Sequence, residues 1–363
     1  MNTKIYTVIA ASGSYIPTQK IDNSYFENHT FHDTDGVRLT KSNELIIDQF
    51  KKITGISQRR YVSDELNTSD IAYLAAKNAI ESAQIDAETL DYIIVAHNFG
   101  DVSTANHHTD MVPALASRVK YKLNIRNPNT IAYDLPFGCA GWLQGVIQAD
   151  QYIKAGYAKQ VLVIGAETLS RVCDPHDRDS MIFSDGAGAI ILKATASDEP
   201  VGILAHLTKS YANELTYVLK MGDSANSQLN GDRVFLKMQG RKLYEHVLKI
   251  VPELIKECLT KASICINDMS KLLIHQANNK MDEAILKQLF ELYDRKDIPA
   301  DIMPMTISWL GNSSVATLPT LYDLIAKHQF TGQSFEHGEH LIFAAVGAGV
   351  NVNALVYKVP GSI

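Results

Sequence analysis

Apolar and polar residues alternate along this chain with two different periods. Continuous apolar runs such as DYIIVAH, KQVLVIGAE and EHLIFAAVG are typical of buried strands, whereas AYLAAKNAIESAQI places its apolar residues on one face of a helix. Strand-like and helix-like runs follow one another in turn. This order predicts an α/β fold with helices packed on largely parallel sheets.

The same order of elements occurs twice. AYLAAKNAIESAQI and DYIIVAH are echoed by VLKIVPELIKECLTKASI and KLLIHQAN. NTIAYDLPFGCAGWLQGVIQADQYIKAG and DIMPMTISWLGNSSVATLPTLYDLIAKHQ each read as a strand, a Gly-containing break and a helix, and a pair of strands closes each half. We therefore predict a duplicated unit, residues 1–195 and 196–363, stacked as a five-layered αβαβα fold. Segments 17–50 and 208–236 are polar, and we expect loops or caps there.

Composition and charge narrow the class of protein. The chain has 363 residues, of which 46% are hydrophobic and 20% charged, so it can bury a large core. Its formal net charge of −6 argues against nucleic-acid binding but leaves room for a local basic dock for an acidic partner. Its four cysteines have no paired framework. Met1–Tyr15 lacks the apolar core of a signal peptide, and no apolar run is long enough to span a bilayer, so we expect a cytosolic protein without a membrane span.

Cys139 lies at a break and not inside a periodic apolar pattern. It follows the strand-like run NTIAYDL and precedes the helix-like run AGWLQGVIQADQYIKAG. The free N–H groups and the positive dipole end of a helix that starts here would favour thiolate over thiol. Gly138 and Gly141 would let a substrate approach the backbone closely. Taken alone, this stretch fits either a nucleophile or an inert cysteine.

Two polar residues of the second half occupy similar breaks. His275 follows the short strand KLLI, and Asn312 lies in the break WLGNSSVATLP that corresponds to the break at Cys139. Each has an ordinary explanation, since His275 can be a hydrogen-bonded buried histidine and Asn312 can be a helix N-cap. Because all three lie at strand-to-helix breaks of a duplicated unit, one pocket between the halves can collect them.

The remaining cysteines are weaker candidates for a nucleophile. Cys173 precedes Asp174, whose charge should raise the pKa of the thiol, so a structural role is favoured. Cys258 and Cys265 lie among apolar residues, and we expect both in the core.

Histidines and carboxylates gather in the segment AHNFGDVSTANHHTD. Their spacing matches no standard metal site, so we expect a polar loop at the rim of a pocket and no metal. The residues are His97, Asp101, His107, His108 and Asp110. Glu167 follows a buried strand, and we expect a structural hydrogen-bonding carboxylate there and not a general base.

Six stretches spread over the chain form a specific combination. They are IDNSYFENHTF, ITGISQRRYV, SRVCDPHDRDSMIFSDGAGAIIL, HQAN, GNSSVATLP and AAVGAGVNVNALV. With Cys-x-Gly, His-Gln-Ala-Asn and Gly-Asn-Ser-Ser in this order, the chain resembles the β-ketoacyl-acyl-carrier-protein synthase III family of the thiolase superfamily over essentially its whole length. The resemblance implies a thiolase-like fold, a homodimer and an acyltransferase that needs no cofactor.

The resemblance also assigns roles to residues of this sequence. Cys139 would carry the acyl group, and His275 and Asn312 would hold the thioester carbonyl of a malonyl-type extender on acyl carrier protein. Loss of CO2 from the extender supplies a carbanion without a strong base, and the two donors would stabilise the resulting enolate. The backbone N–H groups of Cys139 and Gly349 would form a second oxyanion hole for the tetrahedral adduct.

Other positions concern the thioester that donates the acyl group and the docking of acyl carrier protein. Members that use acetyl-CoA clasp its adenine with a tryptophan and an arginine, where Gln49 and Ile53 stand here, and Arg178 keeps the opposite position. This departure predicts loading from a carrier-bound thioester in preference to a CoA thioester, and chains longer than acetyl. Pro136, Phe137 and Trp142 surround the nucleophile in sequence and are expected to reshape its pocket. By the resemblance, Lys280 stands where the family's docking arginine follows HQAN, and Lys237, Arg241 and Lys242 are further candidates for contact with the carrier.

Two other functions remain open at this point. A specialised ketosynthase that joins two larger acyl or β-ketoacyl chains, as in dialkylresorcinol or olefin pathways, would keep the same three residues. A non-catalytic partner subunit would only shape the pocket of a heterodimer, but such partners typically lack the nucleophile, which this chain has. A cysteine hydrolase is excluded because the sequence context of its nucleophile is absent.

Overall fold

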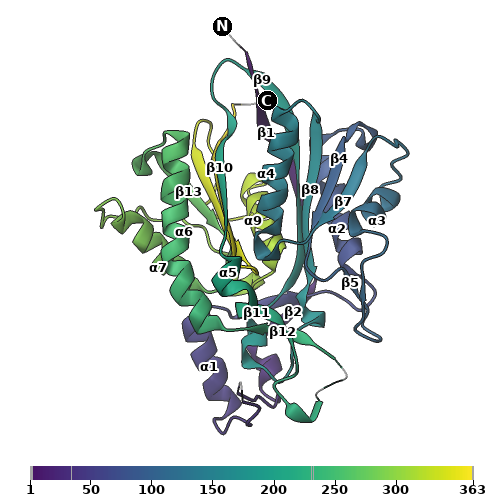
Figure 1. Ribbon diagram of the computed structural model, residues 1–363, viewed down its shortest axis with the longest axis vertical. Coiled ribbons are helices and arrows are strands. Elements are labelled where there is room, and N and C mark those ends of the chain that lie inside the picture. The colour runs from purple at the N-terminus through teal and green to yellow at the C-terminus, as the bar shows by residue number, and fades with distance from the viewer. Residues whose placement is uncertain (1–2, 34, 230, 232, 362–363) are drawn as a thin grey trace.

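The computed structural model describes residues 3–33, 35–229, 231 and 233–361, and it has five layers (Figure 1). Two β-sheets enclose a central layer of helices, and further helices cover the outer face of each sheet. The predicted α/β fold with five layers is confirmed. The outer ends of the two predicted halves, residues 1–2 and 362–363, lie outside the described residues, and the division into two domains stays a prediction.

The first sheet has the strand order β1-β9-β8-β4-β7. β4 is parallel to β7 and β8, whereas β9 is antiparallel to both β8 and β1, so one strand of five runs opposite to the others. The bounds are β1 (Lys4–Tyr15), β4 (Tyr92–Ala96), β7 (Ile131–Leu135), β8 (Gln160–Thr168) and β9 (Asp185–Ser197).

The second sheet repeats this arrangement with one strand fewer. Its order is β10-β15-β14-β13, with β13 parallel to β14 and with β15 antiparallel to its two neighbours. The bounds are β10 (Gly202–Ser210), β13 (Met269–Ile274), β14 (His340–Gly347) and β15 (Asn351–Lys358). β10, β15, β14 and β13 therefore correspond to β1, β9, β8 and β4.

The strand expected at DIMPMTI, the counterpart of β7, is absent among the described residues. Pro304 has no N–H to donate to a sheet. The side chain of Gln276 takes the place of a neighbouring strand, because its Nε2 donates to the Pro304 carbonyl and its Oε1 accepts from the N–H groups of Thr306 and Ile307. This part of the repeat was predicted wrongly.

The long helices form the other layers. α2 and α3 cover the first sheet, α4 and α9 lie between the sheets, and α6 and α7 cover the second sheet (Figure 1). Trp142 of α4 packs against Phe343 of β14 in the core between the sheets. The bounds are α2 (Thr68–Ala83), α3 (Leu115–Lys122), α4 (Gly141–Lys154), α6 (Gly240–Ala262), α7 (Asn279–Glu291) and α9 (Thr317–Ala326).

The segments expected to be loops or caps contain regular structure. α1 (Asn43–Thr54) and β2 (Gln19–Asp22) lie in the first, and β11 (Leu219–Gly222) pairs with β12 (Phe235–Met238) in the second. The other short strands are β3 (Gln58–Tyr61), which pairs with β2, and β5 (Asp101–Val102), which pairs with β6 (Thr109–Asp110). The other short helices are α5 (Ala212–Leu215), α8 (Ile307–Leu310), η1 (Asn23–Phe26), η2 (Ala87–Thr89), η3 (Gly138–Ala140), η4 (Leu169–Arg171), η5 (Arg178–Ile182), η6 (Thr216–Val218), η7 (Ser227–Leu229), η8 (Ile266–Asp268) and η9 (Ser314–Ala316). Within the described residues, no helix combines the length and apolar character needed to cross a bilayer.

Candidate active site

Cys139 lies in the tight turn η3, which connects β7 to α4. Gly138 has φ +61°, and a Cβ there would lie 2.3 Å from the nitrogen of Ala348. A Cβ on Gly347 would lie 2.4 Å from the nitrogen of Cys139. The turn at the nucleophile and the turn after β14 therefore touch through bare backbone, which explains why glycines are needed on both sides.

The surroundings of the Cys139 thiol act on its pKa in opposite directions. Burial raises the pKa, whereas a hydrogen bond from the Ser314 side chain and the backbone N–H of Cys139 lower it. In the free protein the raising effect is the larger. The expectation that the start of α4 alone would favour thiolate is therefore not met, because burial in a low-dielectric site penalises the charge.

His275 and Asn312 are brought together at the end of β13. His275 Nε2 lies 3.0 Å from Asn312 Oδ1, and the backbone N–H of Ser314 donates to the same oxygen over 2.8 Å. Because a backbone N–H can only donate, this atom of Asn312 is an acceptor, and the proton on His275 must be on Nε2. The amide nitrogen of Asn312 is left to face the cavity that Asn312 lines.

His275 is neutral at physiological pH. Burial lowers its pKa to about 4, although the hydrogen bond with Asn312 acts in the opposite direction. Its Nδ1 is buried and has no hydrogen-bond partner among the described residues. In the free protein the neutral imidazole of His275 therefore donates its one N–H to Asn312, and the amide N–H of Asn312 is the donor left free.

An apolar cavity of about 150 Å³ lies beside Cys139. Side chains from four parts of the fold line it, namely Phe99, Leu169, Phe183, Met221 and Leu236. The lining does not include Pro136, Phe137 or Trp142 among the described residues, and Trp142 donates from its indole nitrogen to the Val163 carbonyl in the core. The expectation that these three residues reshape the pocket is wrong, because α4 turns Trp142 toward the second sheet.

A larger cavity of about 580 Å³ leads from Asn312 to the surface between α1, α6 and α7. Gln49 and Ile53 of α1 line it, together with Arg178 of η5, as the comparison with the adenine clasp anticipates. Lys280 and Arg241 line it from the first turns of α7 and α6, and Asp179 adds one acidic group. Because Asn312 lines this cavity and Ser314 lines the smaller one, the turn at 311–314 separates the two.

Lys237 differs from the other basic residues. Its ammonium lies 2.5 Å from Asp174 Oδ2 and 3.1 Å from Asp177 Oδ2, and it lines a neighbouring cavity. Its charge is already neutralised inside the protein, so we leave Lys237 out of the carrier surface.

Gly349 lies in the turn between β14 and β15, next to Ala348, which lines the small cavity. Its φ of +115° suits glycine alone. The role of its N–H as an oxyanion donor stays a prediction.

Glu167 and Asn98 form a hydrogen-bonded pair, and Asn98 lines the small cavity together with Cys139. Both the backbone N–H and the side-chain amide of Asn98 donate to Glu167 Oε1, over 2.6 and 2.7 Å. Burial raises the pKa of Glu167 to about 8, with His97 and Asn98 acting in the opposite direction. The predicted hydrogen-bonding carboxylate is confirmed, but Asn98 and Ser314 were not anticipated beside the nucleophile.

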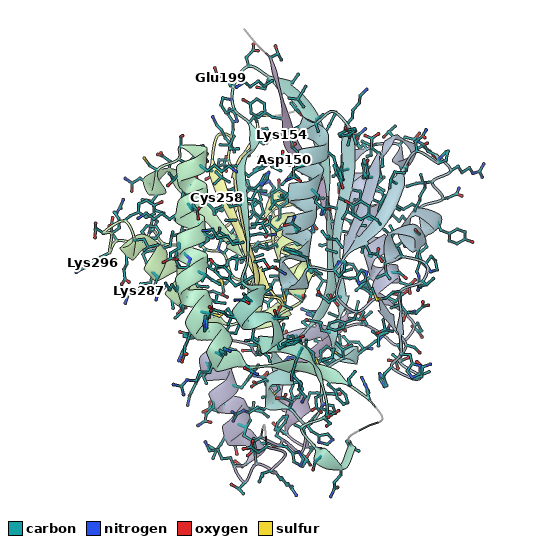
Figure 2. The ribbon with its side chains drawn as sticks, viewed as in Figure 1. Asp150, Lys154, Glu199, Cys258, Lys287 and Lys296 are labelled. Carbon is teal, nitrogen blue, oxygen red and sulfur yellow. The ribbon has the colours of Figure 1, made fainter. Side chains whose placement is uncertain are left out.

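The other cysteines have separate environments. Burial, followed by the charges of Asp185, Asp177 and Asp174, raises the pKa of Cys173 well above its usual value. Cys258 lies on α6 and is buried against the second sheet (Figure 2). Cys265 is exposed, so its predicted place in the core is wrong. It follows the left-handed residue Ser263 that ends α6, where the chain turns outward.

The histidine-rich segment is divided among separate contacts. His97 is buried with its Nε2 3.0 Å from Asp134, whereas Asp101 and Asp110 both bind Arg118. His107 and His108 lie on the exposed connection between β5 and β6. No group of three or more histidine, cysteine or acidic side chains within the described ranges could hold a metal ion.

Comparisons with known proteins agree with this geometry. The family described as 3-oxoacyl-[acyl-carrier-protein (ACP)] synthase III matches residues 133–212, and the C-terminal part of the same family matches residues 259–359. The structure of 3-oxoacyl-[acyl-carrier-protein] synthase III from Aquifex aeolicus VF5 is 27% identical, with a TM-score of 0.77 over 97% of this chain and 99% of that chain.

Two further structures share the fold. The synthase III, FabH, from Pseudomonas aeruginosa PAO1 is 24% identical, with a TM-score of 0.80 and 99% of both chains covered. Xanthomonas campestris OleA, with bound lauric acid and lauroyl-CoA, is 15% identical, with a TM-score of 0.76 over 97% of this chain and 99% of that chain. At these two identities the likeness shows the fold alone. With the family matches in both halves, the chain belongs to the 3-oxoacyl-acyl-carrier-protein synthase III family of the thiolase superfamily.

Proposed function

We propose that this chain is a ketosynthase that loads an acyl group on Cys139 and joins it to a malonyl-type thioester on acyl carrier protein. One observation supports the proposal: Cys139 lines a small apolar cavity on one side of the turn that holds Asn312, and a larger cavity lies on the other side of this turn. The larger cavity beyond this turn opens to the surface. Its volume of about 580 Å³ is large enough to hold a phosphopantetheine arm.

The reaction has two halves that use different groups. In loading, Cys139 sulfur attacks the thioester carbonyl, the carbon–sulfur bond to the donor breaks, and the donor thiol leaves with the proton that Cys139 gave up. The backbone N–H groups of Cys139 and Gly349 are the proposed donors to the tetrahedral oxyanion. This half needs no contact with His275 or Asn312.

In condensation, the carbon–carboxylate bond of the extender breaks and its electron pair forms an enolate. The free amide N–H of Asn312 donates to the enolate oxygen, and the Nε2–H of His275, which bonds Asn312 Oδ1 in the free protein, turns to the same oxygen when the extender binds. Both donors are neutral, because burial keeps the imidazole of His275 uncharged. The enolate carbon then attacks the acyl carbonyl on Cys139. The new carbon–carbon bond forms as the carbon–sulfur bond breaks, and Cys139 leaves as thiolate.

The small cavity sets the size of the acyl group. Its volume of about 150 Å³ is apolar, and dry apolar cavities of about this size hold a ligand as large as benzene. We propose acyl groups of roughly six carbons, longer than acetyl, as the loaded chain.

A second candidate function is a ketosynthase that joins two larger acyl or β-ketoacyl chains. The apolar side chains Ile46, Phe50 and Leu243 in the larger cavity favour it, because they would suit a second hydrocarbon chain. A non-catalytic partner subunit is disfavoured, because such subunits typically lack the nucleophile and this chain has Cys139.

We also propose a cytosolic homodimer. The four free thiols suit a reducing compartment.

Intact-mass analysis tests the proposal. The protein is incubated with C2 to C12 acyl thioesters on CoA and on acyl carrier protein, and we expect one acyl adduct with the highest yield near C6. Cys139→Ala should lose the adduct, whereas Cys265→Ser, which removes the exposed thiol, should keep it. An adduct of unchanged yield on Cys139→Ala would reject the proposal.

The same preparations separate the two half-reactions. His275→Ala and Asn312→Ala should load the acyl group normally but release CO2 from malonyl-acyl-carrier-protein about 100- to 1,000-fold more slowly. Parent rates of CO2 release would remove the assigned roles. Release of a product with two long chains, and no use of malonyl extender, would favour the second function.

A further inference from the structure

Glu167, Asn98 and Ser314 form a hydrogen-bonded row that ends beside Cys139. Asn98 lies on the loop after β4, and its amide nitrogen is 2.7 Å from Glu167 Oε1 and 3.5 Å from Ser314 Oγ. Ser314 is buried at the start of η9, and it lines the small cavity together with Asn98 and Cys139. The row joins three elements that are far apart in sequence.

The direction of each hydrogen bond follows from its partners. Glu167 Oε1 also accepts from the backbone N–H of Asn98, so this oxygen is an acceptor and the atom of Asn98 that faces it is the nitrogen. The same nitrogen has a second N–H, which faces Ser314 Oγ. Because that N–H occupies a lone pair of Ser314 Oγ, the hydroxyl proton of Ser314 is free to point at Cys139.

The backbone holds Ser314 in place. Its φ is +54°, in the left-handed region, and its N–H donates to Asn312 Oδ1 over 2.8 Å. A Cβ on Gly165 would lie 2.2 Å from the carbonyl oxygen of Val315, so β8 presses against the same turn. A strained residue that its surroundings fix in this way is a feature found at functional sites.

We propose that Ser314 is a further catalytic residue, whose hydroxyl donates a hydrogen bond to Cys139 sulfur and stabilises the thiolate. Asn98 is a positioning residue for this hydroxyl, and Glu167 holds Asn98. The proposal rests on the proposed function in that Cys139 is the nucleophile. The hydrogen bond serves both halves of the reaction, because Cys139 is a thiolate when it attacks the donor and again when it leaves the condensed product.

Other titratable groups lie near Cys139, but none of them is proposed to donate a hydrogen bond to its sulfur. Glu167 of β8 lies behind Asn98, with His97 beside it, and Lys220 of β11 lines the cavity rim. His275 stays neutral down to a pH of about 4. Variants of Ser314 leave all of these groups in place, so a difference between variants reports on the hydroxyl.

The test is the pH dependence of Cys139 alkylation by iodoacetamide, read by peptide mass spectrometry in a Cys265→Ser background. Ser314→Ala should raise the apparent pKa of Cys139 by about one unit, which lowers the alkylation rate about tenfold at pH 7 and leaves the high-pH plateau unchanged. Ser314→Gly removes the hydroxyl and relieves the left-handed backbone, so it should give the same shift if Ser314→Ala folds poorly.

Ser313→Ala is the matched control. Its hydroxyl bonds Thr317 and not the nucleophile, so its profile should match that of the parent. Asn98→Leu should give a smaller shift in the same direction as Ser314→Ala. If Ser314→Ala and Ser314→Gly both titrate like the parent, the proposal is wrong.

Alkylation uses no acyl substrate, so the two proposals fail separately. A shifted profile without any acyl adduct would reject only the proposed function. Normal acylation with an unshifted profile would reject only the role of Ser314.

Discussion

Glu167 is a buried carboxyl whose charge state is set by its surroundings. Burial raises its pKa to about 8 against an ordinary value of 4.5, so at pH 7 it is mostly protonated. A neutral Glu167 accepts from Asn98 as an ionised one would, but it places no negative charge near Cys139. The residue can therefore support the nucleophile without opposing thiolate formation.

This raised pKa predicts how stability depends on pH. Between pH 4.5 and 8 the folded protein holds a proton on Glu167 that the unfolded chain has lost, so the free energy of unfolding falls as pH rises through this window. From pH 6 to 8.5 we expect Glu167 to contribute a loss of about 2 kcal/mol. Asp185, with a pKa of about 6, acts mainly below this range.

Urea unfolding at pH 6 and pH 8.5 measures the effect. Glu167→Gln keeps the acceptor oxygen but cannot ionise, so it should lose less stability between the two pH values than the parent does. Glu253→Gln, at an exposed position, should behave like the parent. An equal loss in Glu167→Gln and the parent would contradict the prediction.

A residue of the candidate site could be predicted from the sequence where it lies at the break between a strand and the next helix. Cys139, His275 and Asn312 each lie where a strand ends, and this can be read from the neighbouring sequence. Asn98 and Ser314 were missed because their hydrogen bond joins residues 216 positions apart. The neutral state of His275 was left open for a similar reason, since it depends on burial by the whole fold.

The internal repeat predicted the long elements, because each has a clear apolar period. β1, β9, β8 and β4 have counterparts in β10, β15, β14 and β13. The fifth counterpart failed at Pro304, where a side chain of Gln276 satisfies the backbone that a strand would have paired. α1 was taken for a loop or cap although Ile46, Phe50 and Ile53 recur at helical spacing, so its signal was present in the sequence and was outweighed by the polar residues around it.

β7 is an edge strand of the first sheet, and it predicts self-association. It pairs with β4 on one side, and Ile131 at its start is 47% exposed. Val112 and Tyr121 on neighbouring loops and helices are 86% and 85% exposed. An open edge beside exposed apolar side chains is a site for pairing with a second copy, so we expect a homodimer across β7.

Sedimentation at micromolar concentration tests this expectation. Val112→Asp and Tyr121→Asp should each weaken the dimer at least about tenfold, because a buried carboxylate at an interface is costly. Leu45→Asp on α1, also exposed, should leave the dimer unchanged. A monomeric mass of the parent protein would contradict the prediction.

At the scale of the whole molecule, the protein is acidic on average but has a local cluster of basic residues. The formal net charge is −6, yet Arg178, Lys280 and Arg241 gather at the mouth of the larger cavity. α6 and α7 both begin there, so their positive dipole ends add to the field. Composition predicted the acidic balance, the internal repeat predicted the layered fold, and the resemblance placed basic residues at the mouth of the pocket. The packing of α1 against α7 shows how these residues, far apart in sequence, share one opening.

This opening predicts which donor loads Cys139. An adenine clasp derives about 0.5 to 2 kcal/mol from each aromatic or cation–π contact, and neither Gln49 nor Ile53 can supply one. Of the three positions of the family's clasp, only Arg178 could cover an adenine ring, so we expect a CoA thioester to bind weakly unless Phe50, which lines the same cavity, and Lys52 take the place of the missing clasp residues. A carrier-bound acyl group has no adenine to lose, and we expect its acidic protein to dock on the basic residues outside the cavity.

We therefore expect faster loading from acyl carrier protein than from the matching acyl-CoA. Loading from the carrier should slow with added salt and with Lys280→Glu, because exposed charges are screened over about 8 Å at physiological ionic strength. Lys287→Glu is the control, since Lys287 is an exposed residue of the same helix α7 at the outer edge of the molecule (Figure 2) and is not among the residues that line the cavity. Loading rates for one acyl group on both donors decide the matter. Efficient loading by acetyl-CoA at low micromolar concentration, unaffected by salt or by Lys280→Glu, would show that the free coenzyme is the donor and that Gln49 and Ile53 do not weaken its binding.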